Sequence, residues 1–91
     1  MKQITIAGNI TRDAELRTTQ DGKKVAGFGV AVNDRNKNAT FFDVGLWGKR
    51  GEALCQYLTK GSSVTVIGDF STHENNGKTY LKVNCTEITL Q

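Results

Sequence analysis

Two aromatic rings followed by two cations are the residues of this chain best suited to bind another molecule. Phe41 and Trp47 lie an even number of residues apart, so both side chains point to the same face if the segment is a strand. Lys49 and Arg50 come shortly after them. Rings that stack on bases, beside cations that contact phosphates, can hold single-stranded nucleic acid without reading its sequence. The competing interpretation is that both rings belong to the core.

The segment that carries the rings, residues 40–47, is predicted to be a strand. Within it, Phe42, Val44 and Leu46 alternate with the residues at positions 41, 43, 45 and 47. This period of two is typical of a strand with one apolar face buried. If the prediction holds, the two rings lie on the opposite face, where a ligand can reach them.

A short helix is predicted directly after this strand. Between residues 50 and 59 the apolar positions are spaced as in an amphipathic helix, and Gly61 is expected to end it in a left-handed conformation. Lys60 would then lie where the helix dipole favours a cation, which is an alternative to a role in binding. Arg50 and Glu52 fit an ordinary solvated helix face.

Four more strands are predicted around these two elements. Turn signals separate them, namely Asp-Gly at residues 21–22 and Asn-Gly at residues 76–77. The order strand, strand, strand, helix, strand, strand is typical of an OB-fold. That fold is all-β, a five-stranded barrel, here with one short helix between strands 3 and 4. The four further strands cover residues 3–7, 25–32, 64–70 and 80–90.

The strand over residues 25–32 has one large face and one small face. Phe28 and Val30 lie on the large face, whereas Gly27 and Gly29 lie on the small one. A small face lets a flat ligand or another backbone approach closely. It equally permits the strong curvature of a small barrel, so both interpretations stay open here.

Composition and charge fit one binding domain over residues 1–91, with 37% hydrophobic residues and a net charge of +3. Residues 1–50 hold nine Lys and Arg against five Asp and Glu, whereas residues 51–91 hold three against four. The positive charge therefore accompanies the ring-bearing segment. The sequence has neither an apolar run of ~20 residues nor a secretory signal, so we expect no membrane contact and a cytoplasmic location.

The remaining polar residues do not predict a metal site, a cofactor or an enzyme. Cys55 and Cys85 are far apart and are expected to stay reduced, and His73 has no partner ligand at metal-binding spacing. The acidic residues are scattered over turns without ligand spacing, and no nucleophile–base pair accompanies them. The acidic residues considered as metal ligands are Asp13, Glu15, Asp21, Asp34 and Asp43.

Four segments together resemble the family of bacterial and phage single-stranded DNA-binding proteins. The resemblance follows the family order over nearly the whole chain, and it implies an OB-fold that binds and protects single-stranded DNA in replication, recombination or repair. It also implies self-association as a homodimer or homotetramer. The segments are I-A-G-N-I-T-R-D-A-E-L-R (6–17), D-G-K-K-V-A-G-F-G-V-A-V (21–32), L-W-G-K (46–49) and Y-L-T-K-G-S-S-V-T-V-I-G (57–68).

The resemblance also implies roles for particular residues. Phe41 and Trp47 match base-stacking rings, with Tyr80 and Phe70 as further candidates. The cations fall at or near basic positions of the family, either in its groove or in the loops that flank the groove. These cations are Lys49, Lys60, Arg12, Arg17, Lys23, Lys24, Arg35 and Lys37.

The sequence also departs from the family pattern. Ala14 replaces a usual proline, and the sequence ends at Gln91 without the flexible linker and acidic tail of the family. From this we expect no tail-mediated recruitment of repair enzymes and a compact phage, plasmid or mobile-element version. An alternative function is a protein-docking module like primosomal replication protein N, with DNA contact secondary. Because stacking and phosphate contacts do not read the 2′-hydroxyl, DNA and RNA both remain candidate ligands.

Overall fold

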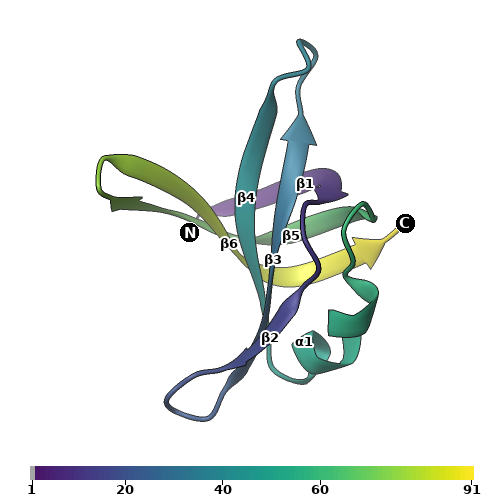
Figure 1. The fold of residues 1–91 in the computed structure, drawn as a ribbon, viewed down its shortest axis with the longest axis vertical. Coiled ribbons are helices and arrows are strands. Elements are labelled where there is room, and N and C mark those ends of the chain that lie inside the picture. The colour runs from purple at the N-terminus through teal and green to yellow at the C-terminus, as the bar shows by residue number, and fades with distance from the viewer. Residues whose placement is uncertain (1) are drawn as a thin grey trace.

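The computed structural model describes residues 2–91, and most of them lie in strands (Figure 1). A single short α-helix and one turn of 3₁₀-helix join the fourth strand of this described part to the fifth. The elements are β1 (Gln3–Ile10), β2 (Glu15–Thr18), β3 (Lys24–Asn33), β4 (Ala39–Trp47), α1 (Lys49–Leu54), η1 (Cys55–Tyr57), β5 (Ser63–Asn75) and β6 (Lys78–Leu90).

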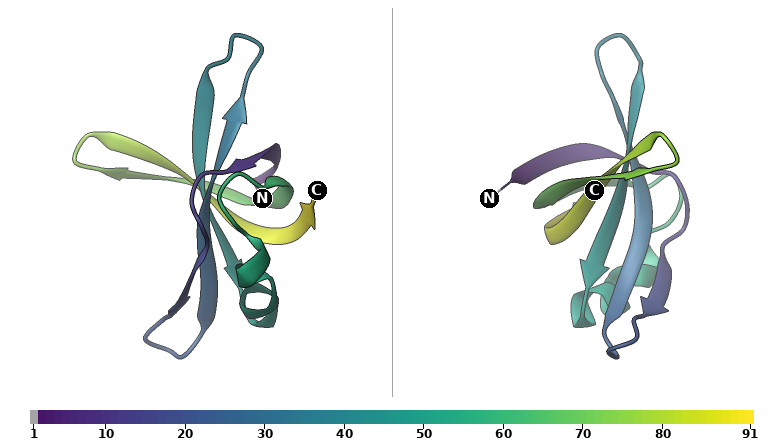
Figure 2. Two further views of the ribbon diagram at one scale, coloured as in Figure 1. Left: turned by 45° about the vertical axis from the view of Figure 1, so that its right-hand side comes forward. Right: turned by 90° about the vertical axis from the view of Figure 1, so that its left-hand side faces the viewer.

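Five of the strands form a closed ring in the order β1, β5, β6, β4, β3. The ring closes where β3 pairs with the end of β1, at Asn9 with Ala31 and Ile10 with Val30. All neighbours in it are antiparallel except β4 and β6, which run parallel. β2 adds to the free side of β3, outside the ring. The views in Figure 2 show the β2–β3, β3–β4 and β5–β6 hairpins extending from this ring. The predicted five-stranded OB-fold is therefore confirmed.

The core fills the inside of the ring with one face from each strand. Phe28 and Val30 of β3 are fully buried, and Phe42 of β4 meets Phe70 of β5 edge to face, with ring centroids 6.4 Å apart. Leu58 enters from the end of η1 and is also fully buried. The alternation predicted for the strands around residues 25–32 and 40–47 is thus the alternation of inside and outside.

Both cysteines are free thiols, as the sequence indicated. Cys55 is half-buried and its Sγ lies 3.5 Å from the carbonyl oxygen of Ala14. Cys85 is buried in the core, and this burial raises the pKa of its thiol. A thiol of raised pKa holds little thiolate at neutral pH and is therefore a poor nucleophile.

The helix is shorter than predicted, and the prediction for Gly61 was wrong. α1 ends at Leu54, and Leu58 leaves helical geometry with φ −90° and ψ 76° as its side chain turns into the core. Gly61 has φ +91° but lies in the following loop, where its N–H donates to the carbonyl of Ile10 at 2.8 Å. The helical spacing of apolar residues continues past the end of the helix because Leu58 is apolar as a core residue and not as part of a helix face.

α1 lies close against the strand ends because of one glycine. Gly51 is buried, and a Cβ added there would meet the backbone carbonyl of Leu46 and, at 3.3 Å, the backbone nitrogen of Ala26. Only a residue without a side chain allows this contact between helix and sheet. The helix is thereby held directly after Trp47, so the end of β4 is fixed in place.

Candidate nucleic-acid interface

The outer face of β4 carries both rings that the sequence singled out. Phe41 is 64% exposed and Trp47 is 43% exposed, so the interpretation that they fill the core is wrong. Asp43 and Gly45 lie between them on the same face. At about 3.3 Å per residue, the two rings lie about 20 Å apart along the strand.

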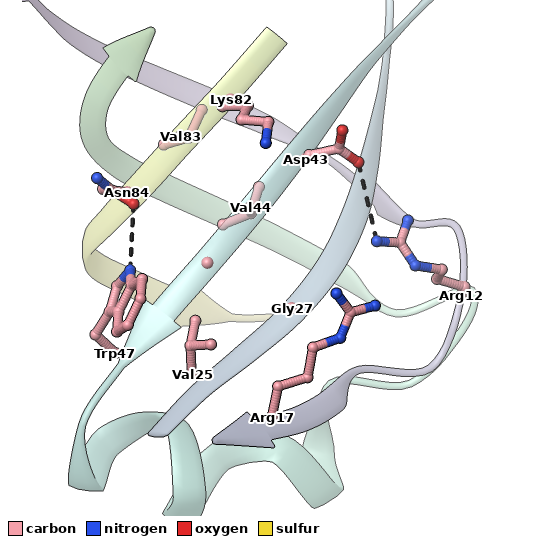
Figure 3. Close-up of a pocket in the computed structure, with 11 residues that line it drawn as sticks. Arg12, Arg17, Val25, Gly27, Asp43, Val44, Trp47, Lys82, Val83 and Asn84 are labelled. Carbon is pink, nitrogen blue, oxygen red and sulfur yellow. Dashed lines mark hydrogen bonds and ion pairs between the residues drawn. The ribbon is translucent and has the colours of Figure 1, made fainter. Parts of the chain in front are cut away.

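Three adjoining hollows follow this face of β4, and we refer to them together as the β4 groove. The central one, of about 450 Å³, is lined by Arg12, Arg17, Val25, Gly27, Asp43, Val44, Gly45, Trp47, Lys82, Val83 and Asn84 (Figure 3). One of about 390 Å³ shares Trp47 and adds Gly22, Lys23, Lys24, Gly48, Lys49 and Glu52. One of about 510 Å³ shares Asp43 and adds Ala39, Thr40, Phe41, Lys78, Thr79, Tyr80 and Leu81. Because Trp47 and Asp43 each line two of the hollows, the three hollows lie next to one another along β4.

Glycines on neighbouring strands form the floor of the central hollow. Gly27 of β3 and Gly45 of β4 are register partners, and both belong to the outward face. A Cβ added at Gly27 would meet no atom within 4 Å, whereas one added at Gly45 would lie 3.3 Å from Cγ2 of Val25. The space above Gly27 is thus open, which favours the close approach of a flat ligand.

Replacing Gly27 with valine is expected to weaken single-stranded DNA binding about fivefold or more without lowering stability. The added side chain would enter the open hollow, and losing one stacked base costs about 1–3 kcal/mol. Valine favours strands, so the fold should tolerate it. Fluorescence anisotropy with a labelled thymidine oligonucleotide measures the affinity. Thr89→Val, at an exposed strand position outside the groove, is the control, and equal affinities for the two variants would contradict the prediction.

Trp47 is held at the groove wall by a residue from β6. Its indole Nε1 donates a hydrogen bond to Oδ1 of Asn84 at 3.2 Å (Figure 3). Asn84 reaches this position because β6 runs parallel to β4, with Asn84 opposite Gly45. The bond satisfies the polar edge of the indole and fixes the direction of the ring.

The two arginines at the groove form ion pairs with carboxylates, and these ion pairs are exposed to solvent. Arg12 Nη2 lies 3.9 Å from Asp43 Oδ1, with the two side chains 51% and 46% exposed. Arg17 Nη2 lies 3.4 Å from an oxygen of Glu15, and both of these side chains are exposed too. Such exposed ion pairs contribute little stability, so the guanidinium groups can exchange them for phosphate contacts at small cost.

The structure brings most of the predicted binding residues together around the groove. Arg35 and Lys37 are exceptions, since they lie in the turn at the far end of the β3–β4 hairpin, which projects at the top of Figure 1. Lys60 is exposed in the loop before β5 and does not line the three hollows. It also lies beyond the last turn of α1, so the helix-dipole alternative for it was wrong. The residues that line the groove are Phe41, Trp47, Tyr80, Arg12, Arg17, Lys23, Lys24 and Lys49.

Sequence reasoning named Tyr80 of β6 but missed three other residues of that strand, and it missed the place of Asp43 in this site. Lys82 and Asn84 line the central hollow, and Nζ of Lys78 lies 5.7 Å from the ring centroid of Tyr80. Lys82 and Asn84 flank buried Val83, so the sequence does reveal that both face outward. Nothing local, however, reveals that β6 lies beside β4, because that pairing joins distant segments.

Within residues 2–91, no three His, Cys, Asp or Glu side chains gather in a way that could hold a metal ion. None of the helices described is both long enough and apolar enough to cross a membrane.

Sequence comparison gives a match along the whole chain. The model of the "Single-strand binding protein family" matches residues 1–91. The single-stranded DNA-binding protein of Treponema pallidum is 37% identical over 100 residues, and that of Oceanobacillus iheyensis is 34% identical over 94 residues. These matches cover 100% and 97% of this chain but 57% and 58% of the relatives. The chain therefore spans little more than half the length of the curated relatives that it matches.

Comparison of structures gives the same kind of neighbour. The second single-stranded DNA-binding protein of Mycobacterium smegmatis superposes with a TM-score of 0.81 at 28% identity, covering 98% of this chain and 87% of that one. A deletion mutant of the single-stranded DNA-binding protein from Thermus aquaticus gives a TM-score of 0.80 at 27% identity, covering 100% of this chain and 41% of that one. Both relatives and both structural neighbours are named as DNA-binding proteins and not as enzymes.

Proposed function

The chain belongs to the single-strand binding protein family, and from this we propose that it binds single-stranded DNA of any sequence and protects it during replication, recombination or repair. The observation that carries the proposal is the β4 groove, where exposed Phe41 and Trp47 lie on one strand face among lysines and arginines. Every base has a face that can stack on a ring, so this arrangement tolerates any sequence. We place the activity in the cytoplasm, in one domain formed by residues 1–91.

In the proposed mode of binding, bases stack on the rings while cations neutralise phosphates. Phe41, Trp47 and Tyr80 supply rings, spaced along the groove. Arg12, Arg17, Lys23, Lys24 and Lys49 supply positive charge at its walls. Arg35, Lys37 and Lys60 lie away from the hollows and would contact only a strand that continues past them.

Titration with poly-dT at two salt concentrations, followed by the fluorescence of Trp47, tests the proposal. Trp47 is the single tryptophan of the chain, so the signal reports one position in the groove. We expect strong quenching, and a fall in affinity with salt whose logarithmic slope is about −0.7 per phosphate neutralised. An unchanged spectrum at low salt and saturating DNA would contradict the proposal and would favour the protein-docking alternative. Poly-U under the same conditions compares RNA with DNA.

We also propose that the chain self-associates, as a dimer or a tetramer. Within residues 2–91, β1 pairs with β5 along its length but with β3 only at Asn9 and Ile10. The other edge of β1 over residues 3–8 is therefore available for pairing with a second copy. One small groove binds modestly, and joining several of them raises the affinity through effective concentration.

A further inference from the structure

One acidic side chain lies in the middle of the β4 groove. Asp43 lines both the central hollow and the hollow that contains Phe41. It lies two residues from Phe41 and four from Trp47 on the same strand face, or about 7 Å and 13 Å along the strand. A carboxylate at this place repels phosphate, so it needs an explanation in a groove that binds a polyanion.

The cations near Asp43 lie on either side of it and leave one carboxylate oxygen open. Figure 3 shows Arg12 and Arg17 on one side of the groove and Lys82, the register partner of Asp43, on the other. Among residues 2–91 the carboxylate has one ion pair, from Oδ1 to Arg12 at 3.9 Å. Its side chain is 46% exposed. Since each carboxylate oxygen has two acceptor sites, most of its hydrogen-bonding capacity is available to a ligand.

This distribution of charge favours different positions for the phosphates and the bases of a bound strand. Phosphate oxygens are acceptors, as are the oxygens of Asp43, so phosphates are driven to the flanking cations. The bases then turn toward β4, where Phe41 offers a stacking surface in the same hollow as the carboxylate. A base that stacks on Phe41 therefore presents a polar edge to a group that only accepts hydrogen bonds.

We propose that Asp43 is a specificity-determining residue that accepts hydrogen bonds from the Watson–Crick edge of a base stacked on Phe41, which gives the groove a preference for guanine. Guanine alone carries two adjacent donors there, N1–H and N2–H₂, which match the two oxygens of a carboxylate. Thymine offers one donor between two carbonyl oxygens, which the carboxylate repels. Adenine and cytosine offer an amino group beside an acceptor nitrogen. The inference rests on the proposed function, since it assumes that single-stranded DNA occupies the groove.

A structural role for Asp43 makes a different prediction. Arg12 Nη1 lies 2.7 Å from where a Cβ on Gly29 would be, so the guanidinium lies directly over β3. If Asp43 served only to hold Arg12 there, removing its charge would change the affinity for all oligonucleotides by the same factor. Selection of a base edge instead changes their relative affinities.

The first experiment uses the unaltered protein and three oligonucleotides of equal length. One is all thymidine, one has a single central guanine, and one has hypoxanthine at that position, which lacks the N2 amino group. Competition against a labelled thymidine oligonucleotide gives their relative affinities. A carboxylate that accepts two hydrogen bonds from a base should yield a preference for guanine over thymine of about fivefold or more, with hypoxanthine between them. Equal affinity for the guanine and thymine oligonucleotides overturns the inference.

The second experiment compares Asp43→Asn with Glu87→Gln, which removes an equal charge at an exposed position of β6 outside the groove. Asp43→Asn should bind thymidine more tightly than the unaltered protein, because its side chain no longer repels phosphate, and it should lose the preference for guanine. Glu87→Gln should keep that preference. A preference that survives in Asp43→Asn, or a uniform change across all three oligonucleotides, overturns the inference. If none of the oligonucleotides binds the unaltered protein, the proposed function itself fails.

Discussion

Replacing both Phe41 and Trp47 with alanine is expected to weaken the binding of single-stranded DNA by about 30-fold or more. Each stacked base is worth about 1–3 kcal/mol, so losing both rings costs at least about 2 kcal/mol. The two rings lie about 20 Å apart along β4, and losses at such separated sites add. Both side chains are exposed, so the barrel should fold without them.

Anisotropy of a labelled thymidine oligonucleotide is the suitable measurement, because the double variant has no tryptophan signal. Tyr57→Ala is the matched control: its ring is 58% exposed in η1 and does not line the groove. That control should bind within about twofold of the unaltered protein, since a surface residue away from the ligand contributes little. If the double variant also bound within twofold, base stacking on β4 would be refuted.

Replacing Phe28 with alanine is expected to lower the free energy of unfolding by about 3–5 kcal/mol. Phe28 is 0% exposed at the centre of β3, and truncating a buried phenylalanine removes its transfer free energy and leaves a cavity. A domain of this size is stabilised by only about 5–15 kcal/mol in total. The variant should therefore be partly unfolded at physiological temperature, or close to it.

Urea unfolding followed by circular dichroism measures this loss, with Phe41→Ala as the matched control. The two substitutions are chemically identical and lie on neighbouring strands, but Phe41 is 64% exposed. A surface substitution should change stability by no more than about 0.5 kcal/mol. Equal destabilisation by the two variants would show that the assignment of inner and outer faces is mistaken.

The strands that could be predicted were those whose burial alternates. Alternation at β3 and β4 separated the face of Phe28, which is buried, from the face of Phe41, which is exposed. A strand with one buried face has apolar residues at every second position, and this pattern is visible in the sequence. β2 has all of its residues exposed, and the outer part of the β5–β6 hairpin over residues 71–75 is likewise exposed. Such segments are held by backbone hydrogen bonds and leave no apolar pattern to detect.

Residue spacing alone predicted the part of the candidate site that lies on β4, and the family resemblance added Tyr80 and the cations of other elements. Phe41 and Trp47 share the face of β4 by spacing alone. Asn84 and Lys82 line the same groove only because β6 runs beside β4, and the sequence separation of such partners carries no signal. From the sequence, Asp43 was a candidate only as a metal ligand. Its place between the two rings suggests a role in binding only once the groove around it is known.

The parallel contact between β4 and β6 also determines when the groove can exist. It consists of three register pairs, at Asp43 with Lys82, Val44 with Val83 and Gly45 with Asn84. Contacts between distant segments carry the largest loop-closure cost, so hairpins such as β3–β4 can form before this seam does. A chain with its hairpins folded but its seam open would have the rings and lack the opposite wall. DNA that binds across the seam would favour the closed form by mass action, so the ligand would help to complete the barrel that holds it.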